Sequence, residues 1–244
     1  WAEGARGLRL TVSGSAPLPS SIFDRWRDLA GQPLLERYGT TETGMALSHP
    51  LHGERHRGSV GGPLPGVEVR LVNEARQDVG DDQPGEIFVR GPGVFAGYWD
   101  RPVVTASAFG DGGWFKTGDV ATRTASGFVI LGRMSVDMIK TGGEKVSALE
   151  VEETLRAHPD ILDCAVVGVP DHEWGERVAA AVVVRPDVSL TLEILRTWAR
   201  PRLAGWKIPT RLAIVTDLPR NTMGKVSKPR LSEMFATATG SSLG

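Results

Sequence analysis

The order of structural patterns over the first 48 residues constrains the fold more than any other feature of this sequence. Apolar and polar residues alternate over positions 8–12, as in a strand. Apolar residues then recur at helical spacing over 22–29, with a serine at 20 or 21 as the candidate cap and Gly31 as the expected end. A second apolar strand begins at Leu34. A strand, a helix and a strand predict a βαβ unit, whose loops lie at the sheet edge where α/β folds bind ligands.

The segment LLERYGTTETGM, which contains this second strand, has the composition of a phosphate-binding turn. Gly39 lets the backbone approach an anion closely, and Thr40 and Thr41 offer hydroxyl and amide donors. Glu42 is a hard oxygen ligand suited to Mg²⁺, and Tyr38 could lie flat against a base. A solvated threonine-rich turn after a buried strand is an equally good interpretation of this stretch alone.

Between residues 49 and 131 glycine and proline punctuate short strands, which predicts a small antiparallel sheet or barrel. The expected strands are 67–72, 86–90, 114–115 and 128–131. In the Thr-Gly-Asp of this region, Asp119 would follow a tight glycine turn. Its carboxylate could accept both hydroxyls of a ribose, or it could simply cap the turn.

Beyond Arg133 a new pattern of helices and strands begins. We expect a helix over 148–158, strands over 164–169 and 179–184, a helix with apolar residues at 192, 195 and 198, and a strand over 212–215. These elements predict a second domain of about a hundred residues, with Ser135-Val136 as the joint. The expected domains are 1–133 (an α/β piece over about 1–48 and a β-rich subdomain over about 49–133) and 134–244.

Composition excludes several classes of protein. The net charge of −1 over 244 residues gives no basic footprint for nucleic acid. The longest apolar run, 178–184, is far short of the roughly 20 residues that span a bilayer. A lone Cys164 rules out an internal disulfide and predicts a reducing compartment, for which we expect the cytoplasm.

Four motifs in a fixed order identify a resemblance. The segments YGTTETG, TGD, GR followed by MSVDMIKTGGEKVSALEVE, and PRNTMGKV closely resemble the adenylate-forming superfamily of acyl-CoA synthetases, luciferases and peptide-synthetase adenylation domains. The resemblance covers residues 8–235. Through VSGSAPLP, ERYGTTET, IKTGGEKVSALEVE and LPRNTMGK the chain looks most like malonyl-CoA synthetases and related short-chain acyl-CoA ligases.

This resemblance implies a fold and a reaction. The fold would be α/β: the carboxyl-terminal part of a large α/β domain with a small β-barrel-like subdomain, followed by a small α+β mobile C-terminal domain. The reaction would be ATP-dependent acyl-CoA ligation, in which a carboxylate, ATP and CoA give acyl-CoA, AMP and diphosphate through an acyl-adenylate. Mg²⁺ would be the metal and CoA the co-substrate.

The resemblance also assigns roles to individual residues. Tyr38 would stack on adenine, Asp119 and Arg133 would hold the ribose, and Lys225 would bridge the attacking carboxylate and the α-phosphate. The predicted catalytic residues are Lys225, Thr41 and Glu42, the last as the metal ligand. The predicted ATP or AMP contacts are Gly14, Ser15, Ala16, Tyr38, Gly39, Thr40, Thr41, Asp119, Arg133 and Lys225. Ser13, Gly14 and Arg37 would contact the acyl substrate, Lys140, Gly142 and Gly143 would serve the thioester step, and Ser135 and Val136 would form the hinge.

The identity of the acid depends on Arg37. A guanidinium just before the Tyr-Gly pair could take a second carboxylate in bidentate fashion, which favours malonate or a methylmalonate-like diacid over a fatty acid. The alternative is that Arg37 points away and pairs with solvent or a neighbouring group.

Two departures from the superfamily limit what this chain can do alone. The early Ser/Thr/Gly-rich phosphate loop with its lysine is missing, and no G-x-x-x-x-G-K-[ST] segment replaces it. Glu144 stands near the place where several relatives carry an arginine, which Lys145 could replace. The chain therefore looks like the carboxyl-terminal half of a ligase, whose N-terminal half, in the same or a separate chain, would be its partner.

Three alternatives stay open. The enzyme could be a medium- or long-chain fatty acyl-CoA synthetase, or an adenylation domain that loads a carrier protein. In a different class, the chain could be a non-catalytic module that binds a nucleotide or CoA.

Overall fold

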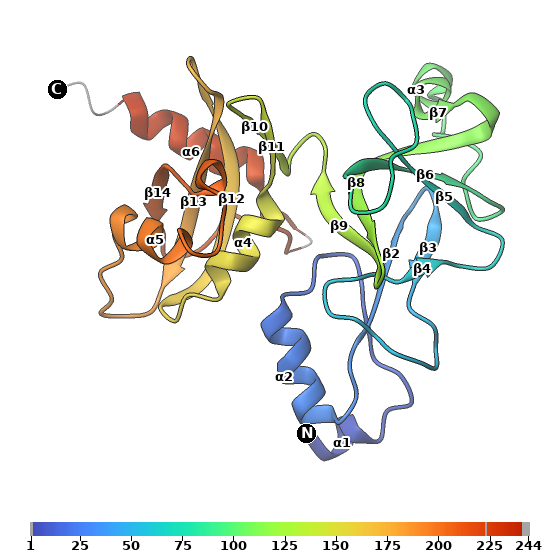
Figure 1. Ribbon diagram of the computed structural model, residues 1–244, viewed down its shortest axis with the longest axis horizontal. Helices are drawn as coiled ribbons and strands as arrows, with labels where there is room; N and C mark the ends of the chain where they lie inside the picture. Colours follow the sequence, from blue (N-terminus) through green and yellow to red (C-terminus); the bar gives the residue numbers. More distant parts are fainter. Residues whose placement is uncertain (1, 223, 241–244) are drawn as a thin grey trace. The chain divides into compact units, whose positions relative to one another are not determined.

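The computed structural model describes residues 2–222 and 224–240; Met223 of the PRNTMGKV motif and the ends of the predicted domains lie outside the described residues. The chain divides into two compact units between Ile130 and Leu131 (Figure 1). The domain boundary expected after Arg133 is close to this division and stays a prediction. The α/β fold class, with a curled β-rich part and a separate small α+β part, is confirmed.

The first unit contains two sheets. Its elements are α1 Ala2–Arg6, β1 Val12–Ser13, α2 Ser20–Ala30, β2 Leu35–Thr40, β3 Gly44–Ser48, β4 Gly62–Pro63, β5 Glu68–Val72, β6 Gly85–Arg90, α3 Pro102–Ala108, β7 Phe109–Gly110, the 3₁₀ turn η1 Asp111–Gly113, β8 Trp114–Thr124 and the first part of β9 Gly127–Arg133. One sheet has the order β1-β2-β3-β4; in the other the order is β5-β6-β8-β7, with β9 also paired to β8.

The predicted βαβ unit is present, but its first strand is shorter than expected. Strand β1 pairs in parallel with β2 through Val12 and Ser13 only. The side chain of Leu8 is 49% exposed, so the alternation over 8–12 does not mark a buried strand face. Neither candidate serine caps α2, since Pro19 is its N-cap and makes no side-chain cap bond. The expected end is correct, because Gly31 closes the helix at φ 73°.

The sequence predicted that Asp119 follows a tight glycine turn, and this prediction is wrong. Residues 117–119 lie inside strand β8, where the pairing with β6 shifts register. Gly118 takes φ 74°, a conformation that favours glycine, and its N–H donates to Glu86 Oε1 at 3.1 Å. The Thr117 hydroxyl donates to the carbonyl of Ile87 at 2.8 Å. Asp119 is thus presented from a β-bulge, a feature that redirects side chains.

The second unit is one five-stranded sheet with helices on both faces. Its elements are β10 Met138–Thr141, β11 Glu144–Ser147, α4 Ala148–Arg156, β12 Ile161–Asp171, β13 Gly175–Val184, α5 Leu192–Ala199, the 3₁₀ turn η2 Gly205–Lys207, β14 Arg211–Ile214 and α6 Lys228–Gly240. The sheet order is β11-β10-β13-β12, with β14 also paired to β13. The predicted helices and strands are all present, although α4 ends at Arg156 rather than 158 and β14 ends at Ile214 rather than 215.

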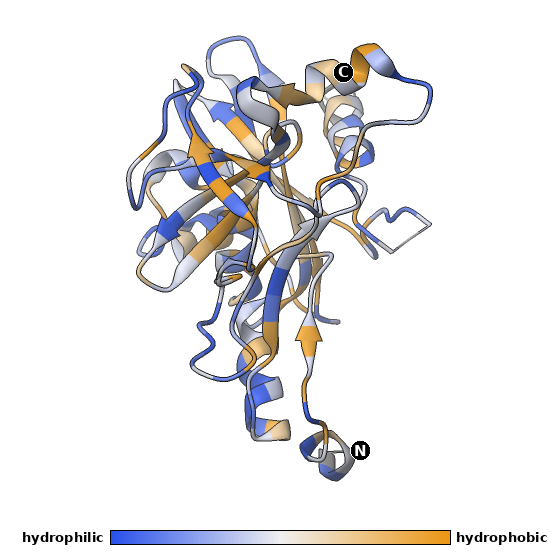
Figure 2. Cartoon of the chain, turned by 90° about the vertical axis from the view of Figure 1, so that its right-hand side faces the viewer, coloured by the Kyte–Doolittle hydropathy of each residue, from blue (hydrophilic) through white to orange (hydrophobic). Residues whose placement is uncertain are grey.

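Successive side chains of β12 and β13 point to opposite faces of the sheet, and each face packs into its own hydrophobic core. Residues such as Val166 and Ala180 pack with Leu155 of α4 and Leu195 of α5, while their chain neighbours face a second core. That second core includes Leu231 of α6. Figure 1 shows α4, α5 and α6 around these two long strands, and Figure 2 shows the hydropathy of each residue along the chain. Because both faces are covered, the unit has a core of its own. No helix in the described part of the chain is long and apolar enough to cross a membrane.

We expect the Cys164 thiol to be almost inert in the folded chain. It is buried in the first of these cores, and burial raises its pKa to about 12, so little reactive thiolate exists near neutral pH. Iodoacetamide labelling followed by mass spectrometry should show slow modification in buffer and fast modification in urea. Equal rates in the two conditions would contradict this burial.

Candidate functional site

The acyl-binding residues expected from the sequence lie together at the end of the βαβ unit. Ser13 is the last residue of β1 and pairs with Glu36 of β2, so the loop that follows β1 begins beside β2. A Cβ added at Gly14 would lie 3.5 Å from Arg37 Cγ and 3.6 Å from Arg37 Nε. The stem of Arg37 therefore passes over Gly14 at contact distance, on the side where an acyl group was predicted.

Ser15 and Ala16 follow on the same loop. Both are exposed, and Ser15 takes φ 70°, a conformation that only a minority of non-glycine residues adopt. This strained backbone turns the loop immediately after Gly14. The predicted contacts of these two residues with the nucleotide stay predictions.

The threonine-rich segment is the turn of a β2-β3 hairpin. Thr40 and Thr43 hold it closed: the Thr40 N–H donates to Thr43 Oγ1 at 3.0 Å, and the Thr43 N–H donates to the carbonyl of Thr40 at 3.3 Å. Thr43 is buried, whereas Thr41 is exposed at the tip. The three threonines thus divide into a structural pair, Thr40 and Thr43, and Thr41, which faces solvent where a phosphate contact is predicted.

Gly39 has a structural reason to be glycine that the sequence did not reveal. A Cβ at this position would overlap the carbonyl oxygen of Gly44 at 2.0 Å. The close approach of the two hairpin strands therefore requires Gly39, whether or not an anion binds. Its predicted phosphate contact stays a prediction.

Glu42 projects from the same turn and is oriented by a residue that sequence reasoning missed. The Tyr98 hydroxyl donates to Glu42 Oε1 at 3.1 Å, and the Phe95 N–H donates to the carbonyl of Glu42 at 2.8 Å. These contacts come from a segment more than 50 residues away in sequence, and no local pattern pointed to it. One carboxylate is not a metal site, and within residues 2–222 and 224–240 no group of three or more His, Cys, Asp or Glu side chains could hold an ion. A single carboxylate does fit Mg²⁺ that is bound largely by substrate phosphates and water.

Tyr38 and Asp119 are brought together by the fold. The Tyr38 hydroxyl donates to Asp119 Oδ2 at 2.7 Å across 81 positions of sequence. The Tyr38 ring is half-buried and packs against the core of the first unit. The resemblance assigns Tyr38 to the base and Asp119 to the ribose of one nucleotide. These two residues are therefore direct neighbours in the fold. Their spacing in sequence alone could not have shown this.

The residues predicted for the thioester step form another hairpin, in the second unit. Lys140 lies in β10, one residue before its end. Gly142 and Gly143 make the turn into β11 with φ 58° and 85°. The Gly142 N–H donates to the carbonyl of Trp174 at 2.9 Å, and a Cβ at Gly142 would lie 2.9 Å from the Trp174 ring. Glu176 Oε2 accepts from the Lys140 N–H at 2.6 Å. Trp174 and Glu176 were not predicted, and they fix the shape of this turn.

Ser135 and Val136 lie in an exposed turn bounded by Arg133 and Asp137. The Arg133 N–H donates to Asp137 Oδ2 at 2.8 Å, and the Asp137 N–H donates back to the carbonyl of Arg133 at 2.7 Å. Ser135 also borders a shallow hollow with Lys140 and Glu176. The same two residues thus close the turn at both ends, and the hinge at Ser135 and Val136 stays a prediction.

Lys225 lies on the loop before α6 and is exposed. Its N–H donates to Asn221 Oδ1 at 3.0 Å, and its carbonyl accepts from the Asn221 N–H at 2.8 Å. Arg220 and Val226 form an isolated β-bridge across the loop. The expected irregular loop is therefore present, with its ends held together. Glu144 and Lys145 lie in β11, opposite Thr141 and Lys140.

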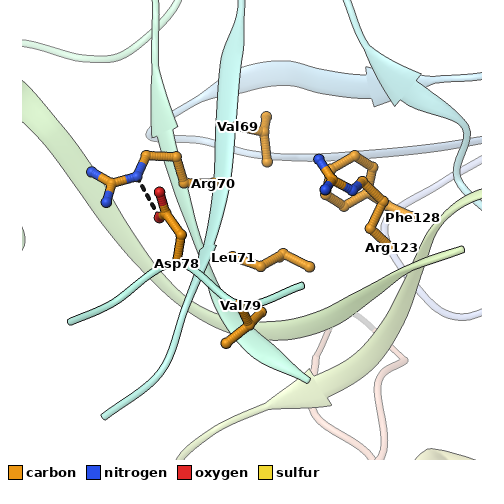
Figure 3. A pocket seen from close by; sticks show the side chains of 7 residues that line it. All are labelled: Val69, Arg70, Leu71, Asp78, Val79, Arg123 and Phe128. Atoms are coloured by element: carbon orange, nitrogen blue, oxygen red, sulfur yellow. Dashed lines mark hydrogen bonds and ion pairs between the residues drawn. The ribbon is translucent and has the colours of Figure 1, made fainter. Parts of the chain in front are cut away.

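A second hollow, in the first unit, does not belong to this site. Figure 3 shows its apolar floor, with Phe128 on one side and the ion pair of Arg70 and Asp78 on the other, whose Nε and Oδ1 are 2.7 Å apart. Arg123 at its border is paired with Asp81. Both arginines already have carboxylate partners, and none of the predicted site residues borders this hollow.

Comparisons with known proteins agree with the motifs. The pattern of the AMP-binding enzyme family matches residues 2–99, and that of the AMP-binding enzyme C-terminal domain matches residues 150–225. The chain is 50% identical over 243 residues to the mitochondrial malonate–CoA ligase ACSF3 of Mus musculus, covering 92% of this chain and 42% of the relative. It is 46% identical to a malonate–CoA ligase of Arabidopsis thaliana, covering 95% of this chain and 40% of the relative.

A solved structure gives the same result. The chain superposes on the ATP-bound MatB of Rhodopseudomonas palustris with a TM-score of 0.88 at 41% identity, covering 93% of this chain and 45% of that one. The chain thus spans less than half the length of the relatives that it matches.

Proposed function

Because this chain belongs to the AMP-binding enzyme family, as part of the adenylate-forming superfamily, we propose that it is the carboxyl-terminal part of an AMP-forming malonate–CoA ligase. Malonate, ATP and CoA would give malonyl-CoA, AMP and diphosphate. The observation that carries the proposal is the hydrogen bond from Tyr38 to Asp119, which brings the predicted base and ribose contacts next to each other. The identity of about half of all positions with malonate–CoA ligases supports the same reaction.

The chemistry requires positive charge at one phosphorus atom. A carboxylate must attack a triphosphate, and negative charge grows on the α-phosphate as diphosphate leaves. We assign the Lys225 ammonium the role of stabilising that charge. Thr41 would bind a phosphate oxygen, and Glu42 would bind Mg²⁺, which neutralises the phosphates when bound. Such aligned electrostatic contacts are usually the largest contribution to catalysis.

The substrate acid follows from Arg37. Its side chain runs across Gly14, so its guanidinium lies at the loop where the acyl group is expected. A guanidinium presents a planar pair of donors that suits a second carboxylate, which acetate and fatty acids lack. This favours a short diacid over a medium- or long-chain fatty acid and over the amino or aryl acids of carrier-protein-loading domains.

The second half-reaction would use the other unit. Lys140 and the Gly142-Gly143 turn would guide the thiol of CoA, after a swing of the second unit about Ser135 and Val136. The fixed shape of that turn, held by Trp174 and Glu176, supports a binding role for it.

The chain alone should catalyse adenylation poorly, because the superfamily's phosphate loop is absent from it and it spans about 42% of its relative. Its expected partner is the missing N-terminal half. We expect the complete protein to act in the cytoplasm, in keeping with the single free cysteine of this chain. The mouse relative is a mitochondrial protein, so the mitochondrion is the competing location, and cell fractionation with a tagged protein distinguishes the two.

ATP–pyrophosphate exchange tests the proposal. We would measure it with malonate, acetate, octanoate and amino acids, on this chain and on the complete gene product that carries it. Malonate-dependent exchange by the complete product alone would support the ligase assignment. Exchange with amino acids would show a carrier-loading domain, and no exchange by either protein with any acid would leave only the non-catalytic binding module.

The role of Glu42 predicts a metal phenotype. In the complete protein, Glu42→Gln should raise the Mg²⁺ concentration needed for half-maximal exchange, because the amide keeps an oxygen for the Tyr98 hydroxyl but removes the charge that holds the cation. Titration of Mg²⁺ at saturating ATP measures the effect. Glu68→Gln, which alters a surface ion pair with Arg90 in the same unit, is the control and should leave the titration unchanged. An unaltered Mg²⁺ requirement in Glu42→Gln would remove this residue from the metal site.

A further inference from the structure

Lys228, the first residue of α6, connects three segments of the second unit. Its Nζ lies 2.6 Å from Asp137 Oδ1 and 2.9 Å from Glu152 Oε1. The Lys228 side chain is 12% exposed, and that of Glu152 is 5% exposed. A largely buried ammonium between two carboxylates is far more constrained than a surface ion pair, because removal of one partner leaves an uncompensated charge.

Both carboxylates are fixed by the backbone. Asp137 Oδ2 accepts the N–H of Arg133 at 2.8 Å, and Glu152 Oε1 accepts the N–H of Val166 at 2.9 Å. Lys228 is thereby held against the turn 133–137, the helix α4 and the strand β12 at once. Its position is determined by three elements, none of which is next to it in sequence.

This anchor stands at one end of the loop that carries Lys225. The other end is anchored by Arg220, whose guanidinium donates to the carbonyl of Gly224 at 2.9 Å and to Asp163 Oδ2 at 2.6 Å. Between these two anchors the backbone is closed by the reciprocal bonds of Asn221 and Lys225. The Lys225 side chain therefore extends from a loop that charged groups hold at both ends.

We propose that Lys228 is a positioning residue for the adenylation half-reaction: through Asp137 and Glu152 it fixes the loop that presents Lys225, and it contacts no substrate. The inference rests on the function proposed for Lys225. Because Asp137 closes the turn that contains Ser135 and Val136, the same ammonium ties that loop to the expected hinge, so that the loop and the turn move as one body.

The test uses the complete protein and matched lysines. Lys207 also pairs with a glutamate of α4: its Nζ lies 2.7 and 2.8 Å from the two carboxylate oxygens of Glu150. Its side chain is more exposed than that of Lys228, and it lies outside the loop that carries Lys225. Lys228→Met should lower kcat for pyrophosphate exchange by about 10²-fold with little change in KM for ATP, since a small misplacement of a catalytic group costs that much. Lys228→Arg should restore part of the rate, and Lys207→Met should match the wild type.

The two half-reactions separate positioning from general loss of structure. Transfer of preformed malonyl-adenylate to CoA should stay near the wild-type rate in Lys228→Met. Equal loss in both half-reactions, or no loss in exchange, would refute the proposal. Because Lys228→Met removes a largely buried ammonium beside Glu152, which keeps Arg156 as its remaining partner, Asp137→Asn is the second variant: its amide oxygen can still accept the Arg133 N–H, and exchange should fall in the same direction.

A measurement on the 244-residue chain keeps this test independent of the proposed function. Hydrogen exchange should show that the amides of Asn221 and Lys225 lose protection in Lys228→Met and keep it in Lys207→Met. If these amides are equally protected in both variants, Lys228 does not order the loop. If the complete wild-type protein shows no ligase activity while the amides respond, the function proposed above fails but the ordering of the loop by Lys228 stands.

Discussion

Replacing Lys225 with alanine should reduce malonate-dependent pyrophosphate exchange in the complete protein by about 10² to 10³-fold, the usual cost of one aligned contact to developing charge. Transfer of preformed malonyl-adenylate to CoA should change little, because the ammonium is needed only while diphosphate leaves the α-phosphate. The fold should be unaffected, since Lys225 is exposed and its loop is held by backbone bonds to Asn221. Single-turnover assays of each half-reaction measure the two effects separately.

Two other lysines of the same unit are the matched controls. Lys140→Ala should give the opposite pattern, with exchange preserved and thioester formation slowed, because Lys140 lies beside the turn expected to guide the thiol. Lys207→Ala removes only a surface pair with Glu150 and should leave both half-reactions unchanged. A Lys225→Ala variant that lost both half-reactions equally would show that its role had been assigned wrongly.

The local chemistry of the site was largely predictable from the sequence, whereas its spatial relationships were not. The Thr-rich turn and the loop after the first strand were predicted because glycine, threonine and helical spacing are local signals. The contact between Tyr38 and Asp119 depends on a β-bulge in β8, and bulges arise from strand register, which no local pattern encodes. For the same reason Asp119 was placed after a turn rather than within a strand.

The positioning residues were missed for a related reason. Tyr98 reaches Glu42, Glu176 reaches Lys140 and Lys228 reaches Asp137, each across at least 36 positions of sequence. These are ordinary polar residues whose partners are set by tertiary packing alone. Gly39 shows the converse: the structure gives this residue a structural reason to be glycine, the nearby carbonyl of Gly44, that the sequence did not reveal, and its predicted phosphate contact stays a prediction. A local motif therefore predicts a turn or a loop from its composition, but not which distant residues hold it in place.

Replacing Arg37 with alanine should abolish the preference for malonate over monocarboxylates. In the wild type, a guanidinium paired with the second carboxylate should favour malonate over acetate and octanoate. A hydrogen bond to a charged group contributes about 1.5 to 3 kcal/mol, so exchange with malonate in Arg37→Ala should fall by roughly 10- to 100-fold in kcat/KM. Acetate and octanoate, which lack a second carboxylate, should be affected far less.

The control for Arg37 is an arginine of the same unit with a different environment. Arg57 pairs with Asp24 on the surface, with Nη1 2.7 Å from Oδ2, and Arg57→Ala should leave the order of substrates unchanged. Arg37→Lys is the more informative variant, because it keeps the charge but loses the planar pair of donors. If bidentate recognition selects the diacid, lysine should recover only part of the preference for malonate. Full recovery would mean that charge alone selects the acid, and an Arg37→Ala variant that still preferred malonate would show that another group makes the selective contact.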